Sequence, residues 1–345
     1  MVLAAVKSIS KMELPANNLD DWMQEISRGR SEEEITRIRA AALYAIESHA
    51  GQTRTSGEDY ANHTFAVAAI VHELGLDADG VIAALLHDTV EDTDVTLQDL
   101  RKQFGGDVAS LVDGVTKMEV IQEFSDDAQS KRNHNAKAES LRKMMLAMVD
   151  DVRVVLIKLC DRLHNMRTLE AVSAEKQRRV ASETLEIFSP LANRLGVWQL
   201  KWELEDLAFR YIEPDIYKSI AKKLSERRVD RQSFIDEFIS QLDTALNSHQ
   251  VEAKIQGRAK HIYSIWTKMR KKGLEFEQLF DVRAVRILVN SVQDCYSALG
   301  IIHTQWKYIA GEFDDYIATP KENNYRSIHT AVIGPGGKVV EVQIR

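Results

Sequence analysis

Five ionisable side chains follow an apolar run within eight positions, from His87 to Asp94. His87 and Asp88 are adjacent, and Glu91 and Asp92 follow them four positions later. If the segment is helical, this spacing puts His87 over Glu91 and Asp88 over Asp92. A solvated helix end explains a single His-Asp pair, but two such pairs behind an apolar run favour a bound cation. Histidine with carboxylate suits Mn²⁺, Fe²⁺ or Zn²⁺ better than Ca²⁺.

Three segments could supply ligands to one metal: His63, the His87-Asp88 pair and Asp161. Open positions would remain for water and a phosphate oxygen, so that the metal would lower the pKa of its water and polarise a phosphoryl group. A satisfied core histidine explains His63 alone, and an ordinary ion pair explains Asp161 alone. The four residues together favour a metallo-phosphohydrolase.

The residues around this set have expected roles of their own. Glu91 and Asp92 could orient or deprotonate the water. Arg54, in the loop before His63, could hold a substrate phosphate. We take His164 as structural.

A second polar group lies after residue 248. Arg258, Lys260 and Ser264, with the backbone N–H groups of a helix start, could hold a triphosphate. Asp281 could bind Mg²⁺, and Glu341 could be a second ligand or a base. The segment Lys321–His329 supplies an aromatic face for a base and polar groups for a second nucleotide. Each of these features is common by itself.

The elements that must position these residues are of two kinds. Up to about residue 195 the periodicity is helical, with a capping box at Ser31 and Glu34 and an N-cap at Asp150-Asp151. The expected helices there include Asp79–Leu86, Val108–Met118 and Val152–Leu169, and residues 119–137 are expected to form a mobile insertion. Further helices are expected at Trp198–Ile212 and residues 216–247.

After residue 248 the pattern changes to a mixture of strands and helices. Strands are expected at residues 251–255, Phe280–Asn290, Arg326–Gly334 and Lys338–Arg345, with helices at Lys260–Lys272 and Gln293–Ile309. Pro335-Gly336-Gly337 between the last two strands is a hairpin signal. The predicted fold class is therefore α+β, with an all-α part before a mixed-sheet part.

The net charge, the cysteine content and the lack of long apolar runs limit the possible functions. A net charge of −7 indicates no general polyanion-binding role. Cys160 and Cys295 are the only cysteines, which excludes a disulfide framework and fits a reducing cytoplasm. No signal peptide and no apolar run of about 20 residues is found, so we expect a cytoplasmic protein without a membrane partner.

The residues His63, His87-Asp88 and Asp161 on a helical domain resemble the HD phosphohydrolase superfamily. Four longer strings are similar to the long RelA/SpoT-type (Rel) enzymes, which make and degrade the alarmone (p)ppGpp: Leu86–Thr93, Val112–Lys117, Lys158–Thr168 and Lys201–Asp206. The resemblance runs from about residue 31 to the C-terminus. It implies a lead-in over residues 1–30, a hydrolase domain over 31–195, a helical connector over 196–247 and a nucleotidyltransferase-like synthetase domain over 248–345.

For the first domain, the resemblance implies Mn²⁺-dependent removal of the 3′-pyrophosphate from (p)ppGpp. The implied metal ligands are His63, His87, Asp88 and Asp161. Catalysis would fall to Glu91 and Asp92, and substrate contacts to Arg54 and Asn165.

For the second domain, the resemblance implies Mg²⁺-dependent transfer of the β,γ-pyrophosphate of ATP to the 3′-oxygen of GDP or GTP. Asp281 would bind Mg²⁺, and Glu341 would activate the 3′-hydroxyl. Tyr325 would stack on guanine. The other implied substrate residues are Arg258, Lys260, Ser264, Lys268, Lys321, Asn323 and His329.

The sequence departs from the family pattern in several places. Glu312–Asp315 has the acidic E-x-D-D form of synthetase-only relatives, although the hydrolase residues are intact. Thr55 stands where a lysine is usual, Ala259 where a proline is usual and Asn324 where a glycine is usual. The sequence also stops at Arg345, so we expect a catalytic fragment. The family's contacts with ribosome and tRNA use a C-terminal region that this sequence does not contain.

Our leading hypothesis is a bifunctional alarmone enzyme fragment. One alternative is a synthetase whose helical domain is only a regulatory scaffold, which the acidic motif favours and the complete metal set opposes. Another is a nucleotide sensor that binds at both sites without turnover.

Overall fold

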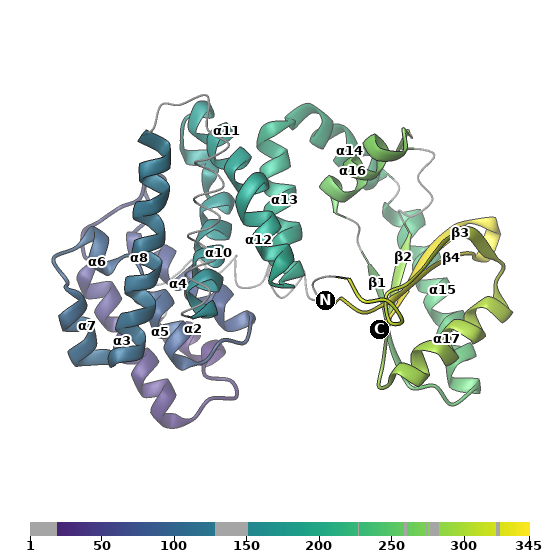
Figure 1. The fold of residues 1–345 in the computed structure, drawn as a ribbon, viewed down its shortest axis with the longest axis horizontal. Coiled ribbons are helices and arrows are strands. Elements are labelled where there is room, and N and C mark those ends of the chain that lie inside the picture. Colours follow the sequence, from purple (N-terminus) through teal and green to yellow (C-terminus); the bar gives the residue numbers. More distant parts are fainter. Residues whose placement is uncertain are drawn as a thin grey trace. The chain divides into compact units, whose positions relative to one another are not determined.

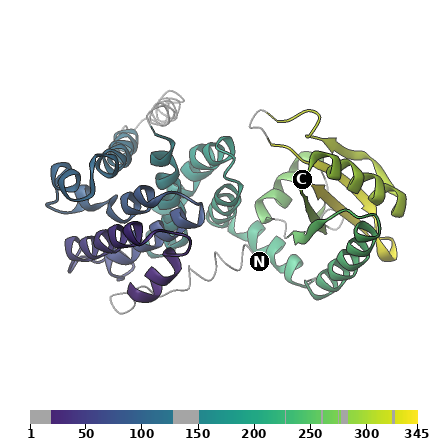
Figure 2. The ribbon, with the colours of Figure 1, turned by 90° about the horizontal axis from the view of Figure 1, so that it is seen from below.

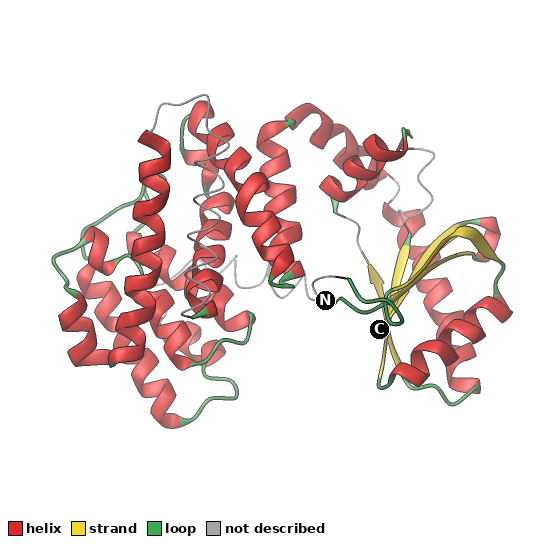
Figure 3. Cartoon of the chain, in the orientation of Figure 1, coloured by secondary structure: helices red, strands yellow, loops and turns green. Residues whose placement is uncertain are grey.

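The structure is a computed structural model that describes residues 19–127, 151–226, 228–258, 261–273, 275–276, 283–321 and 325–345. The chain divides into two compact units, one ending at Phe188 and the next beginning at Ser189. The described part of the first unit is helical, and the second contains a five-stranded mixed sheet (Figure 3). The predicted α+β fold class is confirmed.

The first unit is a bundle of helices (Figure 1, Figure 2). Its centre is α5 (Ala78–Leu86), which packs against α3, α4, α8 and α10 and is buried along nearly its whole length. The other elements are α2 (Leu19–Ile26), α3 (Glu32–Ser48), α4 (Tyr60–Glu73), α6 (Thr89–Asp92), α7 (Leu97–Phe104), α8 (Gly106–Asp127), α10 (Val152–Arg167), η1 (Leu169–Ala171), α11 (Ala174–Glu183) and η2 (Thr184–Phe188).

Two predicted helix starts are confirmed. Ser31 and Glu34 form a reciprocal capping box at the start of α3. Asp151 caps α10 by accepting a hydrogen bond from the backbone N–H of Arg153 at 2.8 Å. Helix α10 carries residues of the core and also polar residues such as Asp161. The position at which the helix begins therefore determines which of its side chains face α4.

The expected helix Asp79–Leu86 is present as α5, and the chain is not helical at His87 and Asp88. His87 caps the C-terminus of α5, and Asp88 is the N-cap of the short helix α6. The Thr89 hydroxyl donates to the carbonyl of Leu86 at 2.6 Å, a side-chain bond that competes with helix continuation. The condition under which His87 would lie over Glu91, a single regular helix through both residues, is therefore not met. The break lets the adjacent His87 and Asp88 side chains face the same cluster.

A second correction concerns the predicted insertion. Helix α8 continues to Asp127, so residues 119–127 are helical rather than part of a loop. The rest of the predicted insertion, residues 128–137, lies outside the described residues.

The second unit combines helices with the sheet. Its helical elements are α12 (Ser189–Arg194), α13 (Trp198–Ile212), α14 (Pro214–Glu226), α15 (Arg228–Ser248), α16 (Ile262–Lys272), α17 (Val292–Gln305) and η5 (Pro335–Gly337). Its strands are β1 (Ala253–Arg258), β2 (Ala284–Val289), β3 (Tyr308–Asp315), β4 (Ile328–Ile333) and β5 (Val339–Ile344). The strand order is β1-β2-β5-β4-β3, with β2 and β5 parallel and the other pairs antiparallel.

One face of the sheet carries the core. Val285, Val342 and Ile344 are fully buried there against Phe238 of α15 and Ile302 of α17. Since side chains alternate along a strand, the opposite face must carry the neighbouring positions. On that face lie Glu341 and Gln343 of β5, His329 of β4, and Glu312 and Asp314 of β3.

Most of the predicted elements of this unit are present, with two differences. The expected helix Gln293–Ile309 ends at Gln305, and the strand β3 follows it. This edge strand is largely exposed and lacks an alternating apolar pattern, so its sequence has no strand signal. Residues 216–247 form parts of two helices, α14 and α15, instead of one.

The predicted hairpin between β4 and β5 is confirmed. Gly336 and Gly337 in its turn have φ values of 62° and 72°, which favour glycine. Among the described residues, no helix combines the length and apolar character required to cross a bilayer.

Candidate active site

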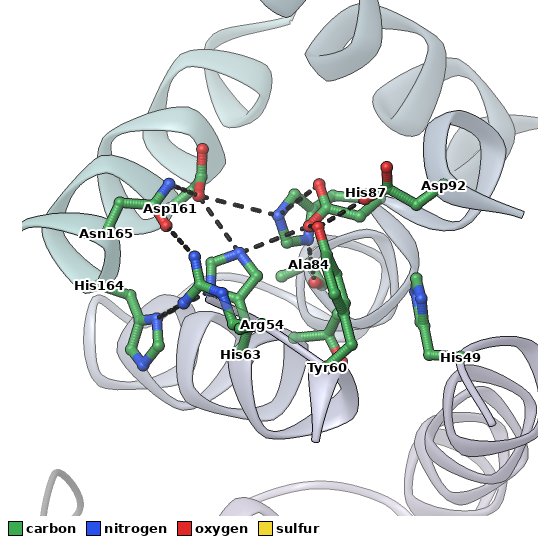
Figure 4. A network of polar contacts seen from close by, with 12 residues as sticks. His49, Arg54, Tyr60, His63, Ala84, His87, Asp92, Asp161, His164 and Asn165 are labelled. Carbon is green, nitrogen blue, oxygen red and sulfur yellow. Dashed lines mark hydrogen bonds and ion pairs between the residues drawn. The ribbon is translucent and has the colours of Figure 1, made fainter. Parts of the chain in front are cut away.

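The residues predicted to bind metal meet at the centre of the first unit. His63 comes from α4, His87 from the end of α5 and Asp161 from α10, and all three point toward one another (Figure 4). Each is buried and offers a ligand atom within 4.8 Å of those of the others. Asp88 lies beside this group, with Oδ2 3.4 Å from Nε2 of His63 and Oδ1 3.0 Å from Nε2 of His87. The structure therefore brings all four predicted residues together.

The orientation of His87 fits a cation at this point. Its Nδ1 lies 2.8 Å from the carbonyl oxygen of Ala84. A carbonyl only accepts, so Nδ1 carries the proton in this bond and the neutral ring keeps its lone pair on Nε2. That Nε2 is buried and has no hydrogen-bond partner, although a carboxylate oxygen lies 3.0 Å away. A buried nitrogen left in this way beside carboxylates is the donor that a divalent metal requires.

The carboxylates of the group are charged. Burial opposes ionisation of Asp161, but the Lys158 ammonium and the two histidines outweigh it and hold its pKa well below the usual value. Burial likewise opposes ionisation of Asp88, and His87 and His63 lower its pKa well below the ordinary range. Two anions in one buried site make it a strong cation site.

Lys158 was not singled out from the sequence. Its side chain is 2% exposed, and its Nζ lies 2.8 Å from Oδ2 of Asp161. The two residues are three positions apart on α10, a spacing that could have identified the pair.

Tyr60 is a second residue that the sequence reasoning missed. Its hydroxyl contacts Oδ2 of Asp88 at 2.9 Å and also the carboxylate of Asp92. Burial and the charge of Asp88 raise its pKa well above the usual value, so the hydroxyl stays a donor. It thereby joins the inner group to Asp92, whose side chain is exposed like that of Glu91. Tyr60 lies three residues before His63 on α4, and this i,i+3 spacing was the available signal.

The predicted substrate residues Arg54 and Asn165 are connected to the same group. Arg54 Nη2 donates to Oδ1 of Asn165 at 2.5 Å, and Asn165 Nδ2 donates to Oδ1 of Asp161 at 2.6 Å. Arg54 Nη1 also donates to Nδ1 of His164 at 3.3 Å, and that atom lies 2.7 Å from Nδ1 of His63 (Figure 4). His164 was predicted to be structural, yet it contacts a residue of the central group directly.

A cavity of about 430 Å³ opens onto these residues. Both cationic and anionic side chains line it. They are Arg54, Lys158, Arg162 and Lys176 on the one hand and Asp88, Glu91, Asp92, Asp161 and Glu183 on the other. The arrangement can hold a metal at its base and an anionic ligand above.

The second unit has a cavity of about 250 Å³ on the face of the sheet opposite the core. It is lined by the predicted residues Lys268, His329 and Glu341, together with Glu312 and Asp314. Gln343 Nε2 donates to Oε1 of Glu341 at 2.9 Å and orients that carboxylate.

The acidic motif of β3 is divided by strand alternation. Glu312 and Asp314 face the cavity, whereas Phe313 is 45% exposed. Asp315 caps the following turn, accepting hydrogen bonds from the backbone N–H groups of Ile317 and Ala318 at 2.9 Å. Two of the three acids of the motif are thus placed to act on a ligand in the cavity.

Tyr325 belongs to an aromatic cluster. Its ring centroid lies 6.1 Å from that of Tyr316 and 5.3 Å from that of Trp198, and its hydroxyl lies 2.8 Å from Nε2 of His329. Lys321 Nζ lies 4.1 Å from the centroid of Tyr316. The structure therefore brings three predicted residues together, Tyr325, His329 and Lys321, and adds Trp198 and Tyr316.

The start of α16, where the sequence indicated a triphosphate site, is capped by a carboxylate. Asp206 of α13 accepts hydrogen bonds from the backbone N–H groups of Ile262 at 3.3 Å and Tyr263 at 2.8 Å. Ser264 and Lys268 lie one turn apart further along the helix. An anion that used these two N–H groups would have to displace Asp206.

Other predicted residues of this site cannot be placed. Lys260, Asp281 and Asn323 lie outside the described residues, as does the side chain of Arg258, whose backbone ends β1. Their roles stay predictions.

Comparison with known proteins identifies both halves of the chain. Residues 41–198 match the family model of the HD domain, and residues 257–345 match that of the region found in RelA/SpoT proteins. These two matches confirm the resemblance to RelA/SpoT-type proteins.

Among the individual relatives, one is named as a pyrophosphohydrolase and two are named as GTP pyrophosphokinases. The chain is 45% identical over 345 residues to a probable guanosine-3′,5′-bis(diphosphate) 3′-pyrophosphohydrolase of Synechocystis, covering 98% of this chain and 44% of the relative. It is 45% identical over 320 residues to a GTP pyrophosphokinase of Myxococcus xanthus, covering 93% and 42%. It is 50% identical over 276 residues to a GTP pyrophosphokinase of Photobacterium angustum, covering 80% and 37%. The chain spans less than half the length of these relatives.

Proposed function

We propose that the first unit hydrolyses (p)ppGpp to GDP or GTP and pyrophosphate. The observation that carries the proposal is the convergence of His63, His87 and Asp161 at the base of a cavity lined by Arg54 and Lys176. The buried nitrogens and carboxylates suit a divalent cation, for which we propose Mn²⁺. The bound cation would supply Lewis acidity and a more acidic water.

In this proposal each protein group has a separate task. His63, His87, Asp88 and Asp161 hold the metal. The cationic Arg54 and Lys176 bind phosphate oxygens, since guanidinium and ammonium groups make charge-assisted hydrogen bonds to phosphate. Asp92, held by the Tyr60 hydroxyl, accepts a proton from the attacking water, with Glu91 beside it. Water adds to the phosphorus, the bond to the 3′-oxygen breaks, and that oxygen takes up a proton.

We propose a second reaction for the sheet unit, the Mg²⁺-dependent transfer of the β,γ-pyrophosphate of ATP to the 3′-hydroxyl of GDP or GTP. The bond between the β-phosphorus and the α,β-bridging oxygen breaks, and AMP leaves. Glu341 in the cavity, oriented by Gln343, would accept the hydroxyl proton. Lys268 and Ser264 would bind the donor phosphates, and Tyr325 with Lys321 and His329 would hold the guanine nucleotide. Asp281 is the proposed Mg²⁺ ligand. The names of the relatives support this activity.

The proposed partners are these nucleotides, and the proposed location is the cytoplasm. The two cysteines, Cys160 and Cys295, are free and buried, as expected of a protein in a reducing compartment.

One experiment tests both reactions. The protein is incubated with ppGpp and Mn²⁺, and separately with ATP, GDP and Mg²⁺, and the products are followed by chromatography. We expect pyrophosphate release in the first incubation that the substitution His63→Ala removes. Release that His63→Ala leaves unchanged would contradict the proposed site.

The same experiment distinguishes the alternatives. Synthesis of ppGpp without hydrolysis would indicate that the helical unit is a scaffold. Nucleotide binding without any turnover would indicate a sensor.

A further inference from the structure

His164 lies next to His63, one of the proposed metal ligands, and its Nδ1 atom has two polar neighbours. Its Nδ1 is 2.7 Å from Nδ1 of His63 and 3.3 Å from Nη1 of Arg54. An arginine N–H can only donate, so the Nδ1 of His164 must be the acceptor in that bond and carries no proton.

Because Nδ1 of His164 is an acceptor, it determines which ring nitrogen of His63 carries the proton. Two nitrogens 2.7 Å apart need one proton between them, and Nδ1 of His164 does not supply it. The proton is therefore on Nδ1 of His63. In the neutral ring the lone pair is then on Nε2, the atom that lies 3.3 Å from Asp161 Oδ1 and 3.4 Å from Asp88 Oδ2.

His87 reaches the same state by a different route. Its Nδ1–H bonds to a backbone carbonyl, that of Ala84, so that in the neutral, metal-binding ring the lone pair is also on Nε2. One histidine is thus oriented by the main chain, which no substitution removes, and the other by a side chain, which a substitution can remove.

We infer that His164 is a positioning residue that holds His63 in the tautomer and orientation needed to ligate a divalent metal through Nε2. Outer partners of this kind typically change metal affinity 10- to 100-fold when they are removed. The inference rests on the proposed metal site and adds to it a residue with no ligand role of its own. Arg54 completes the arrangement as the donor that keeps Nδ1 of His164 unprotonated.

The test measures Mn²⁺ binding by calorimetry, without nucleotide, in the full chain. The substitution His164→Leu removes the acceptor, and we expect Mn²⁺ affinity to fall about 10- to 100-fold. His164→Asn keeps an acceptor oxygen near the place of Nδ1, and we expect it to restore most of the affinity. His72→Leu is the matched control, because His72 also lies 3.3 Å from an arginine, Arg30, but contacts no residue of the metal group in the described structure.

Equal Mn²⁺ affinity in His164→Leu and the unsubstituted protein would overturn the positioning role and leave the metal site standing. No Mn²⁺ binding by the unsubstituted protein would overturn both. Nitrogen-15 NMR of the metal-free, unsubstituted protein provides a measurement that does not depend on the folding of a variant. We expect His63 to carry its proton on Nδ1, and a neutral ring protonated on Nε2 would overturn the inference.

Discussion

The two candidate sites differ in how their polar groups are partnered. In the helical unit, His63, Asp161 and Asn165 contact one another or a common neighbour at distances of 2.6–3.3 Å, and the carboxylates already face the place of a cation. In the sheet unit, Lys268 is 4.0 Å from Glu312 and His329 is 3.9 Å from Glu341. The groups of the helical site thus lie within hydrogen-bonding distance of one another, whereas these two ion pairs of the sheet site are longer.

The difference has a physical cause. Buried charges must be paired, because an isolated ion in the interior costs several kcal/mol, so a buried metal site is held together by its own network. The side chains of the sheet-site pairs are between 18% and 43% exposed, so water screens their charges more than it screens those of the helical site. The helical site should therefore lose function abruptly when a member of the network is removed.

The largest effect is expected for His87→Ala. Loss of a ligand whose Nδ1 is already fixed by the main chain should reduce Mn²⁺ affinity by more than about 100-fold, beyond the effect of an outer partner. Hydrolysis of ppGpp should fall with it, while pyrophosphate transfer from ATP to GDP should be unchanged. Parallel assays of the two reactions measure this, and a matching loss of transfer would contradict the independence of the two sites.

Glu341→Gln is the corresponding substitution in the sheet unit. It preserves the size of the side chain and removes the proposed base, so pyrophosphate transfer should fall about 10²- to 10⁴-fold with hydrolysis unchanged. Steady-state rates with ATP and GDP measure the loss. Asp315→Asn at the end of β3 is the control, since Asp315 caps a turn outside the cavity. If transfer persisted in Glu341→Gln, another residue would have to be the base.

The pH dependence of stability reports on the buried network. Burial, with the neighbouring His63 and Arg54, lowers the pKa of His164 to about 2. An unfolded histidine has a pKa near 6.5, so as the pH falls below 6.5 the unfolded chain binds a proton that the folded chain does not. The metal-free protein should lose about 1.4 kcal/mol of stability per pH unit below pH 6.5 from this residue.

His87 does not contribute to the pH dependence of stability below pH 6.5. Burial alone would lower its pKa, but Asp88 and Asp161 outweigh burial and raise it to about 9. It is therefore charged in both states below pH 6.5, and the stability it contributes is lost only as the pH rises toward 9. Urea unfolding at pH 6.5 and pH 5 should show a smaller difference in His164→Asn than in the unsubstituted protein. An equal difference in both proteins would show that His164 binds a proton in the folded state.

The smallest effect is expected for Asp206→Asn in the sheet unit. The amide oxygen can still accept from the N–H groups at the start of α16, but the negative charge is gone. A triphosphate that competes for this helix start should then bind several-fold more tightly. Calorimetry with ATP measures the change, and Asp215→Asn in the first turn of α14 is the control. Unchanged or weaker ATP binding would indicate that the phosphates do not use this helix start.

Much of the fold could be predicted from the sequence because it depends on local signals. The capping boxes, the helical periodicity of α10 and the glycines of the β4–β5 turn act over a few residues. The strand β3 could not be predicted, because an exposed edge strand needs no apolar alternation.

The sequence by itself predicted the chemistry of the helical site: the types and spacing of His63, His87-Asp88 and Asp161 indicated a cation site. Tertiary structure decided which neighbours act on them. His164 and His63 are 101 positions apart, and Asp206 meets Tyr263 from 57 positions away. No local pattern encodes such contacts, because packing of separate helices creates them.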